Sequence, residues 1–124
     1  MNKTIKILYV DDDFLNLMSF EVLFKDKFVV FIAPNVKKGL DIFNKNDISV
    51  VITDQKMPEM SGVKFLKEVI KKNSNTLRII HSGYLHNEEV EEGIKEGVVN
   101  YFLDKPLNEN LLLDIIEKYI KNTM

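Results

Sequence analysis

The stretch Val50-Val51-Ile52-Thr53-Asp54-Gln55-Lys56-Met57-Pro58 decides the fold of this chain. Its first four residues are all β-branched and mostly apolar, which favours a short strand buried in the protein interior. The run stops at one carboxylate, Asp54, and then Pro58 and Gly62 indicate a loop. Open α/β sheets bind ligands beyond the carboxyl ends of their strands, so we expect Asp54 to lie in a functional site.

Apolar runs and helical patterns alternate five times along the chain. The apolar runs are nearly continuous, as in strands that are covered on both faces of a parallel sheet. We expect strands at residues 5–10, 28–33, 48–53, 77–81 and 98–103, and helices that begin near residues 14, 36, 62, 87 and 108. This order predicts an α/β fold, a doubly wound five-stranded parallel sheet with helices on both faces.

Local signals mark the ends of individual helices. Asp13 is suited to cap the helix at residues 14–25, because its carboxylate accepts a free N–H of the first turn. Leu15, Met18 and Val22 share one face of that helix, which is the pattern of an apolar stripe. Gly97 favours the end of the fourth helix.

Length and composition bound the class of protein. The 124 residues suit one domain, which we expect to span residues 1–124, and 45% hydrophobic with 29% charged residues is an ordinary globular balance. The formal net charge of −2 gives no reason to expect direct binding of nucleic acid. The absence of cysteine excludes disulfides and thiolate chemistry and fits the cytoplasm, where we expect the protein. We find neither a signal peptide nor the run of about 20 apolar residues that spans a bilayer, and we expect no membrane partner.

Five polar residues follow the expected strands at their carboxyl ends. Asp11 and Asp12 follow the first strand, Asp54 the third, Ser82 the fourth and Lys105 the fifth. The carboxyl ends of parallel strands share one edge of a sheet, so we expect these residues to converge. Their spacing agrees, since Asp12 and Asp54 are two strand–helix units apart and each later residue follows after one further unit.

Three carboxylates at one edge repel each other, and a divalent cation relieves that repulsion. Mg²⁺ prefers an octahedron of oxygen ligands, typically one or two carboxylates with waters and a phosphate. We expect Asp12 and Asp54 to bind it directly, Asp11 to act through water, and a carbonyl just past Asp54 to complete the set. Asp54 would attack phosphorus in line to form an acyl phosphate, while Lys105 and the Ser82 hydroxyl each bind a phosphoryl oxygen.

Four motifs occur in this order along the chain: Ile7-Leu8-Tyr9-Val10-Asp11-Asp12-Asp13, Asp54-x-x-Met57-Pro58-x-Met60-x-Gly62, Ser82-Gly83 and Lys105-Pro106. Together they resemble the motifs of the receiver domain of bacterial two-component response regulators. The resemblance covers the whole chain and implies a flavodoxin-like sheet with the strand order 2-1-3-4-5.

The resemblance implies a function in phosphorelay signal transduction. A histidine kinase or histidine phosphotransfer protein would phosphorylate Asp54, Ser82 would be the switch hydroxyl, and Lys105, in a cis peptide bond with Pro106, would pair with the phosphate. The implied magnesium ligands are Asp11, Asp12, Asp54 and the carbonyl of Lys56.

The implied role is that of a signalling phosphoacceptor and not of an enzyme, although one that assists its own phosphorylation and dephosphorylation. A downstream protein or output domain would read the phosphorylation state on a surface made by the fourth helix, the fifth strand and the fifth helix.

Some positions depart from the family pattern or vary within it. The switch aromatic, often Tyr in the family, is Phe102 here, which can change between outward and inward packing but has no hydroxyl. Tyr101 is adjacent, yet strand alternation points it to the other face. In the family, the positions held here by Lys56 and Tyr84 vary and tune how fast the phosphoryl group is lost. Our hypothesis is that Tyr84 shields the phosphoryl group from water and that Lys56 pairs with it.

Two alternatives fit parts of the sequence. Asp11-Asp12-Asp13-Phe14-Leu15 resembles the Asp-x-Asp motif of haloacid-dehalogenase-type phosphohydrolases, with Asp11 as nucleophile. However, the chain is short for that fold and no second acidic motif follows the strand before Lys105. The other alternative is a receiver-like module that binds partners without phosphorylation, but such modules usually lack part of the acidic set, which is complete here.

Overall fold

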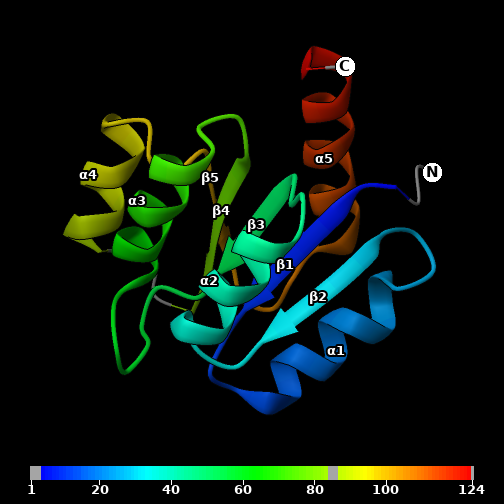
Figure 1. Cartoon of the computed structure of the whole chain (residues 1–124), viewed down its shortest axis with the longest axis horizontal. Coiled ribbons are helices and arrows are strands. Elements are labelled where there is room, and N and C mark those ends of the chain that lie inside the picture. The colour runs from blue at the N-terminus through cyan, green and yellow to red at the C-terminus, as the bar shows by residue number, and fades with distance from the viewer. Residues whose placement is uncertain (1–3, 84–86, 124) are drawn as a thin grey trace.

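A computed structural model of the chain describes residues 4–83 and 87–123, in which strands and helices alternate (Figure 1). The elements are β1 (Lys6–Val10), α1 (Phe14–Phe24), β2 (Val29–Ala33), α2 (Val36–Lys45), β3 (Val50–Thr53), α3 (Gly62–Lys72), β4 (Leu77–Ser82), α4 (Glu88–Lys95), β5 (Tyr101–Asp104) and α5 (Glu109–Thr123). All strand pairs are parallel, in the order β2-β1-β3-β4-β5. The predicted fold class and strand order are confirmed.

The sheet separates two hydrophobic cores. Alternate strand residues, such as Val51 and Ile52, point to opposite faces and belong to different cores. Helices α2, α3 and α4 cover one face, and α1 and α5 cover the other (Figure 1). Strand β3 is buried at every residue in the middle of the sheet, so the stretch that ends at Asp54 is held rigidly from both sides.

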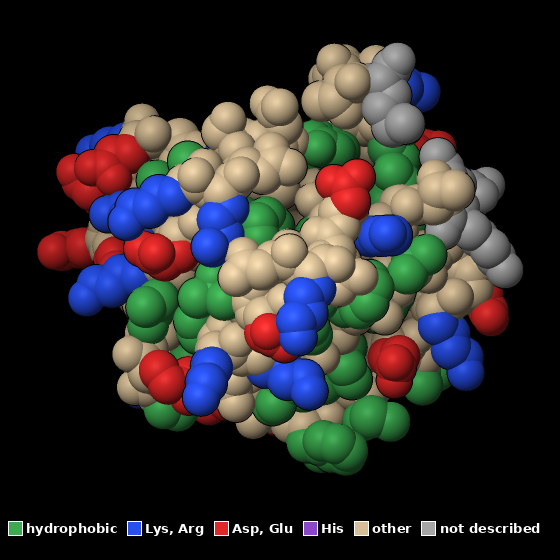
Figure 2. All heavy atoms as spheres, viewed as in Figure 1, with side chains coloured by type: hydrophobic (Ala, Val, Ile, Leu, Met, Phe, Trp, Pro, Cys, Tyr) green, Lys and Arg blue, Asp and Glu red, His purple; other side chains and the backbone are tan. Residues whose placement is uncertain are grey.

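The apolar stripe predicted for α1 is wrong. Leu15 and Val22 are 73% and 62% exposed, and Figure 2 shows green hydrophobic side chains over α1 along the lower edge of the molecule. The buried residues of the helix are Leu17, Phe20 and Phe24. Most residues of α1 are apolar, so two stripes compete, and the stripe that carries two phenylalanines buries more apolar surface. Their rings join an aromatic cluster with Tyr9 and Phe28, in which Phe20 stacks on Tyr9 and the other pairs are tilted.

The fifth strand begins later than predicted, at Tyr101 and not at residue 98. Val98 and Val99 are buried, but their N–H groups donate to the carbonyl of Gly93 at 2.8 and 3.1 Å and not to a neighbouring strand. These residues therefore close the end of α4. The predicted role of Gly97 is confirmed, because its φ of 79° is the left-handed conformation that glycine adopts most easily.

The helices begin where the capping residues predict. Asp13 accepts the N–H of Leu15 at 2.9 Å at the start of α1, and Asn108 accepts the N–H of Leu111 at 3.0 Å at the start of α5. Within the described ranges, no helix has the length and apolar character required to cross a membrane.

Candidate functional site

Three carboxylates meet at the carboxyl edge of the sheet. Strands β1 and β3 are neighbours, with Val10 opposite Thr53, so the residues that follow them lie side by side. One carboxylate oxygen from each of Asp11, Asp12 and Asp54 lies within 4.8 Å of the others. Asp11 is buried, Asp12 is exposed and Asp54 lies between these extremes, so the cluster opens to solvent on one side. The predicted convergence is confirmed for these three residues.

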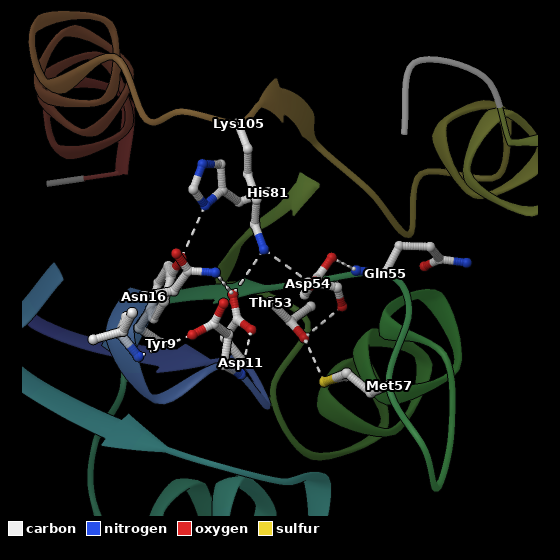
Figure 3. A network of polar contacts seen from close by, with 11 residues as sticks. Tyr9, Asp11, Asn16, Thr53, Asp54, Gln55, Met57, His81 and Lys105 are labelled. Atoms are coloured by element: carbon white, nitrogen blue, oxygen red, sulfur yellow. Dashed lines mark hydrogen bonds and ion pairs between the residues drawn. The ribbon is translucent and has the colours of Figure 1, made fainter. Parts of the chain in front are cut away.

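Lys105 brings a positive charge into this cluster. Its Nζ donates to Asp11 Oδ2 at 3.0 Å and to Asp54 Oδ2 at 3.1 Å (Figure 3). The backbone N–H of Lys105 donates to the Ser82 carbonyl at 3.0 Å, which fixes the residue just beyond β5. Burial alone would lower the pKa of Lys105, but the hydrogen bonds and charges of the two carboxylates outweigh burial and raise it. The predicted cis peptide bond between Lys105 and Pro106 is confirmed.

Asp11 and Asp54 differ in how far they are available to a reactant. The Asp11 side chain is 1% exposed, and besides Lys105 its oxygens accept the N–H of Asp13 at 2.9 Å and the amide of Asn16 at 3.1 Å. The Asp54 side chain is 13% exposed and, apart from Lys105, accepts the N–H of Gln55 at 2.7 Å. Asp54 is therefore the better placed nucleophile, and the geometry does not favour the phosphohydrolase alternative based on Asp11.

The loop between β3 and α3 packs tightly against Asp54. A side-chain carbon on Gly62 would lie 2.3 Å from the Asp54 carbonyl oxygen, so only glycine fits at the start of α3. The Gly62 N–H donates to the Gln55 carbonyl at 2.9 Å, which closes the loop. Lys56, whose carbonyl is the predicted metal ligand, has an exposed side chain within this loop.

The predicted switch residues lie on one face of the sheet. Ser82 is the last residue of β4 and is fully buried. Phe102 lies opposite Ile80 in the β4–β5 pair, is half-buried, and packs against the core under α3 and α4. Tyr101 is 40% exposed. Tyr84, the predicted shield of the phosphoryl group, lies outside the described residues.

A buried pair of aromatic residues lies beneath the site. The Tyr9 hydroxyl is 2.9 Å from His81 Nδ1 (Figure 3), and no described residue offers a hydrogen-bond partner to His81 Nε2. One ring nitrogen of His81 is therefore hydrogen-bonded within the described residues and the other is not. Burial, with the nearby Lys105, lowers the pKa of His81 to about 4, and burial raises the pKa of Tyr9. His81 is therefore neutral at physiological pH.

Sequence reasoning missed Asn16 and Gln55. Asn16 reaches Asp11 from the first turns of α1, and Gln55 holds both the Asp54 carboxylate and the start of α3. Neither residue type signals a site by itself. Gln55 is nevertheless only 4% exposed, and a buried amide must have hydrogen-bond partners. Its burial, which the sequence does not show, is therefore the signal that marks it as part of the site.

Comparison with known proteins agrees with this geometry. Residues 7–117 match the family model of the response regulator receiver domain. The chain therefore belongs to the receiver domain family of response regulators, whose class of function is two-component phosphorelay signalling.

Individual relatives show how much is shared. Sporulation initiation phosphotransferase F of Bacillus subtilis is 31% identical over 116 residues, which cover 93% of each chain. The hydrogenase transcriptional regulatory protein HoxA of Cupriavidus necator is 27% identical over 97% of this chain, but the chain spans only 25% of HoxA. The crystal structure of a response regulator receiver domain protein from Clostridium thermocellum is 31% identical, with a TM-score of 0.84 and 96% of both chains covered.

Proposed function

We propose that Asp54 accepts a phosphoryl group from the phosphohistidine of a histidine kinase or histidine phosphotransfer protein. The observation that carries this proposal is the position of Lys105, whose ammonium group bridges Asp54 and Asp11 at 3.1 and 3.0 Å beside the exposed Asp12. A carboxylate that is partly open to solvent and already paired with a cation is suited to attack an anionic donor. The relative from Bacillus subtilis is named a phosphotransferase, which supports this reading.

The transfer replaces one bond to phosphorus by another. An oxygen of Asp54 attacks phosphorus, the bond from phosphorus to the donor imidazole nitrogen breaks, and that nitrogen leaves with the bonding electron pair and takes up a proton. The product is an acyl phosphate on Asp54. Lys105 is protonated and held in place, so it neutralises charge on the transferred group without reorganising.

The donor set fits a hard divalent cation. Three carboxylate oxygens within 4.8 Å of one another, only one of them from a fully buried residue, match the oxygen ligands that Mg²⁺ prefers. Asp11, Asp12, Asp54 and the Lys56 carbonyl would hold it. When bound, Mg²⁺ supplies positive charge to phosphoryl oxygens that this acidic edge would otherwise repel.

The phosphorylated form then changes the partner surface. In this proposal Ser82 moves toward the phosphoryl group, Phe102 fills the space that is vacated, and the surface of α4, β5 and α5 changes its affinity for a downstream protein or output domain. The equilibrium shifts only by the difference in interaction that the phosphoryl group makes with the two states. Lys56, by pairing with the phosphoryl group, and Tyr84, by shielding it from water, set how fast the domain assists its own dephosphorylation.

Beryllofluoride, a mimic of the phosphoryl group, tests the proposal. With Mg²⁺ present, we expect it to shift the amide NMR signals around Asp54 and those of α4 and β5, and to do neither in Asp54→Ala. Absence of any spectral change in the wild-type chain would favour a module that binds partners without phosphorylation. Shifts confined to the site, with none in α4 or β5, would contradict the switch.

A further inference from the structure

The first turn of α4 is joined to the loop that follows Asp54 by two short hydrogen bonds. Glu89 Oε1 accepts from Gln55 Nε2 at 2.7 Å, and Glu89 Oε2 accepts from the Ser61 hydroxyl at 2.8 Å. One carboxylate thus holds both ends of the β3–α3 loop, since Gln55 opens it and Ser61 caps α3. We refer to Gln55, Ser61 and Glu89 as the loop clamp.

Gln55 connects the loop clamp to the phosphorylation site. Its backbone N–H donates to Asp54 Oδ1 at 2.7 Å, and its side-chain carbonyl accepts the N–H of Val63 at 3.0 Å. Its amide group carries the bond to Glu89, and Figure 3 shows this side chain pointing away from Asp54 toward α4. The side chain is therefore fixed at both of its polar atoms, and the residue directly follows the proposed phosphoacceptor.

Part of this loop borders open space on the α4 side. A hollow of about 390 Å³ opens there, lined by Gln55, Lys56, Met57, Ser61 and Asn87. Hydrogen bonds across the edge of the hollow help to position the loop, and those of Glu89 join it to α4 at 2.7 and 2.8 Å.

We propose that Gln55 and Glu89 are positioning residues for phosphorylation, and that they couple α4 to the site by a route separate from Ser82 and Phe102. This inference rests on the proposed function. Glu89 orients Gln55, and Gln55 orients the Asp54 carboxylate and the adjoining carbonyl of Lys56. Because coupling between two sites is reciprocal, a partner that binds α4 and disturbs Glu89 changes the affinity of the site for a phosphoryl group.

The position of Glu89 provides its own control. Glu88 lies in the same turn, has the same charge and is exposed to solvent. Both carboxylates lie in the first turn, at the positive end of the helix, so Glu88→Ala removes a charge from that end and leaves the loop clamp intact. Glu89→Gln keeps the clamp as well, because its carbonyl accepts from Gln55 and its amide donates to the Ser61 oxygen.

The experiment measures binding of beryllofluoride with Mg²⁺ to the full chain and to Glu89→Ala, Glu89→Gln and Glu88→Ala. We expect Glu89→Ala to weaken binding about tenfold, as loss of a group that orients metal ligands does. Glu89→Gln and Glu88→Ala should bind within about twofold of the wild type. Equal binding by Glu89→Ala and Glu88→Ala would overturn the inference, whereas a wild-type chain that does not bind at all would overturn the proposed function instead.

A double variant separates positioning from general loss of structure. If Glu89 acts through Gln55, Gln55→Ala combined with Glu89→Ala should weaken binding no more than the stronger single variant does. Additive losses would show that the two residues act independently and would contradict the loop clamp as the route of coupling. Amide hydrogen exchange of each variant, in the absence of beryllofluoride, reports whether the protein core stays folded.

Discussion

The positively charged side chains of Arg78 and Lys105 lie near opposite edges of the sheet, and different kinds of group bind them. Lys105 lies at the carboxyl edge and is bound by two carboxylates. Arg78 lies at the amino end of β4, is 6% exposed, and is bound by neutral backbone carbonyls. Those carbonyls belong to Ser74, Thr76, Gly97 and Val98, at 2.7–3.1 Å.

The different partners give the two side chains different roles: Lys105 makes an exchangeable contact, and Arg78 makes a structural one. The carboxylates that hold Lys105 raise its pKa, and they are also the groups that a metal ion or a phosphoryl group would engage. Burial lowers the pKa of Arg78, and its carbonyl partners are neutral backbone groups away from the carboxylate cluster. Lys105 is thus placed to exchange partners, whereas Arg78 ties the loop after α4 to the sheet through uncharged groups.

Replacing Arg78 tests the structural contact and should have the largest effect. Arg78→Met removes the donor from four backbone carbonyls, two of them in buried hydrogen bonds, so we expect the free energy of unfolding in urea to be about 3 kcal/mol lower than in the wild type. The loss should be the same in Mg²⁺ as in EDTA. A change below about 1 kcal/mol would show that water replaces the guanidinium and that the contact is not structural.

Replacing Lys105 tests the exchangeable contact. Lys105→Met removes the cation that faces the transferred group, so we expect phosphorylation by acetyl phosphate to slow about 100-fold. The variant should also be less stable in EDTA, because the buried Asp11 carboxylate loses its only described cationic partner, and Mg²⁺ should restore part of that stability. If the variant is equally destabilised with and without Mg²⁺, Lys105 makes a structural contact like that of Arg78, and its proposed exchange of partners is contradicted.

Acidification tests the electrostatics of the carboxyl edge through His81, a buried residue whose pKa the charge of Lys105 helps to lower. The pKa of His81 is lowered to about 4 in the folded protein, so between its usual value and 4 the unfolded chain binds a proton that the folded chain does not. The stability that depends on neutral His81 is therefore fully present above the usual pKa of histidine and is lost as the pH decreases toward 4. We expect wild type to lose about 2 kcal/mol more than His81→Gln between pH 7 and pH 5, measured by urea unfolding. Equal losses would mean that His81 is protonated in the folded state.

An exposed apolar residue gives the baseline. Val22 on α1 is 62% exposed, so Val22→Ser should change the free energy of unfolding by less than about 0.5 kcal/mol and leave phosphorylation by acetyl phosphate unchanged. A larger loss of stability would mean that Val22 packs against the protein and that the comparison needs a different reference.

The parts of the structure that follow from sequence are those set by periodicity and by strand ends. Strand β3 and the convergence of Asp11, Asp12 and Asp54 are predictable, because parallel strands deliver their last residues to one edge. The buried face of α1 is not predictable in the same way. Apolar residues occur almost all round that helix, and which face is buried depends on the aromatic cluster that Phe20 and Phe24 form with Tyr9 and Phe28.

The residues that hydrogen-bond to the site residues could not be predicted from the sequence either. Gln55, Asn16 and Glu89 are ordinary polar residues along the chain, and their importance comes from which carboxylate or amide they meet in three dimensions. The start of β5 was misplaced for a related reason. Val98 and Val99 have the composition of a strand, but their N–H groups close the end of α4.

The most direct test of the account identifies the residue that carries the phosphoryl group. The wild-type chain is incubated with acetyl phosphate and Mg²⁺, the acyl phosphate is reduced with borohydride, and the modified peptide is mapped by mass spectrometry. The account predicts that Asp54 alone is modified and that Asp54→Asn gives no modified peptide. Modification of Asp11, or of no residue at all, would contradict it.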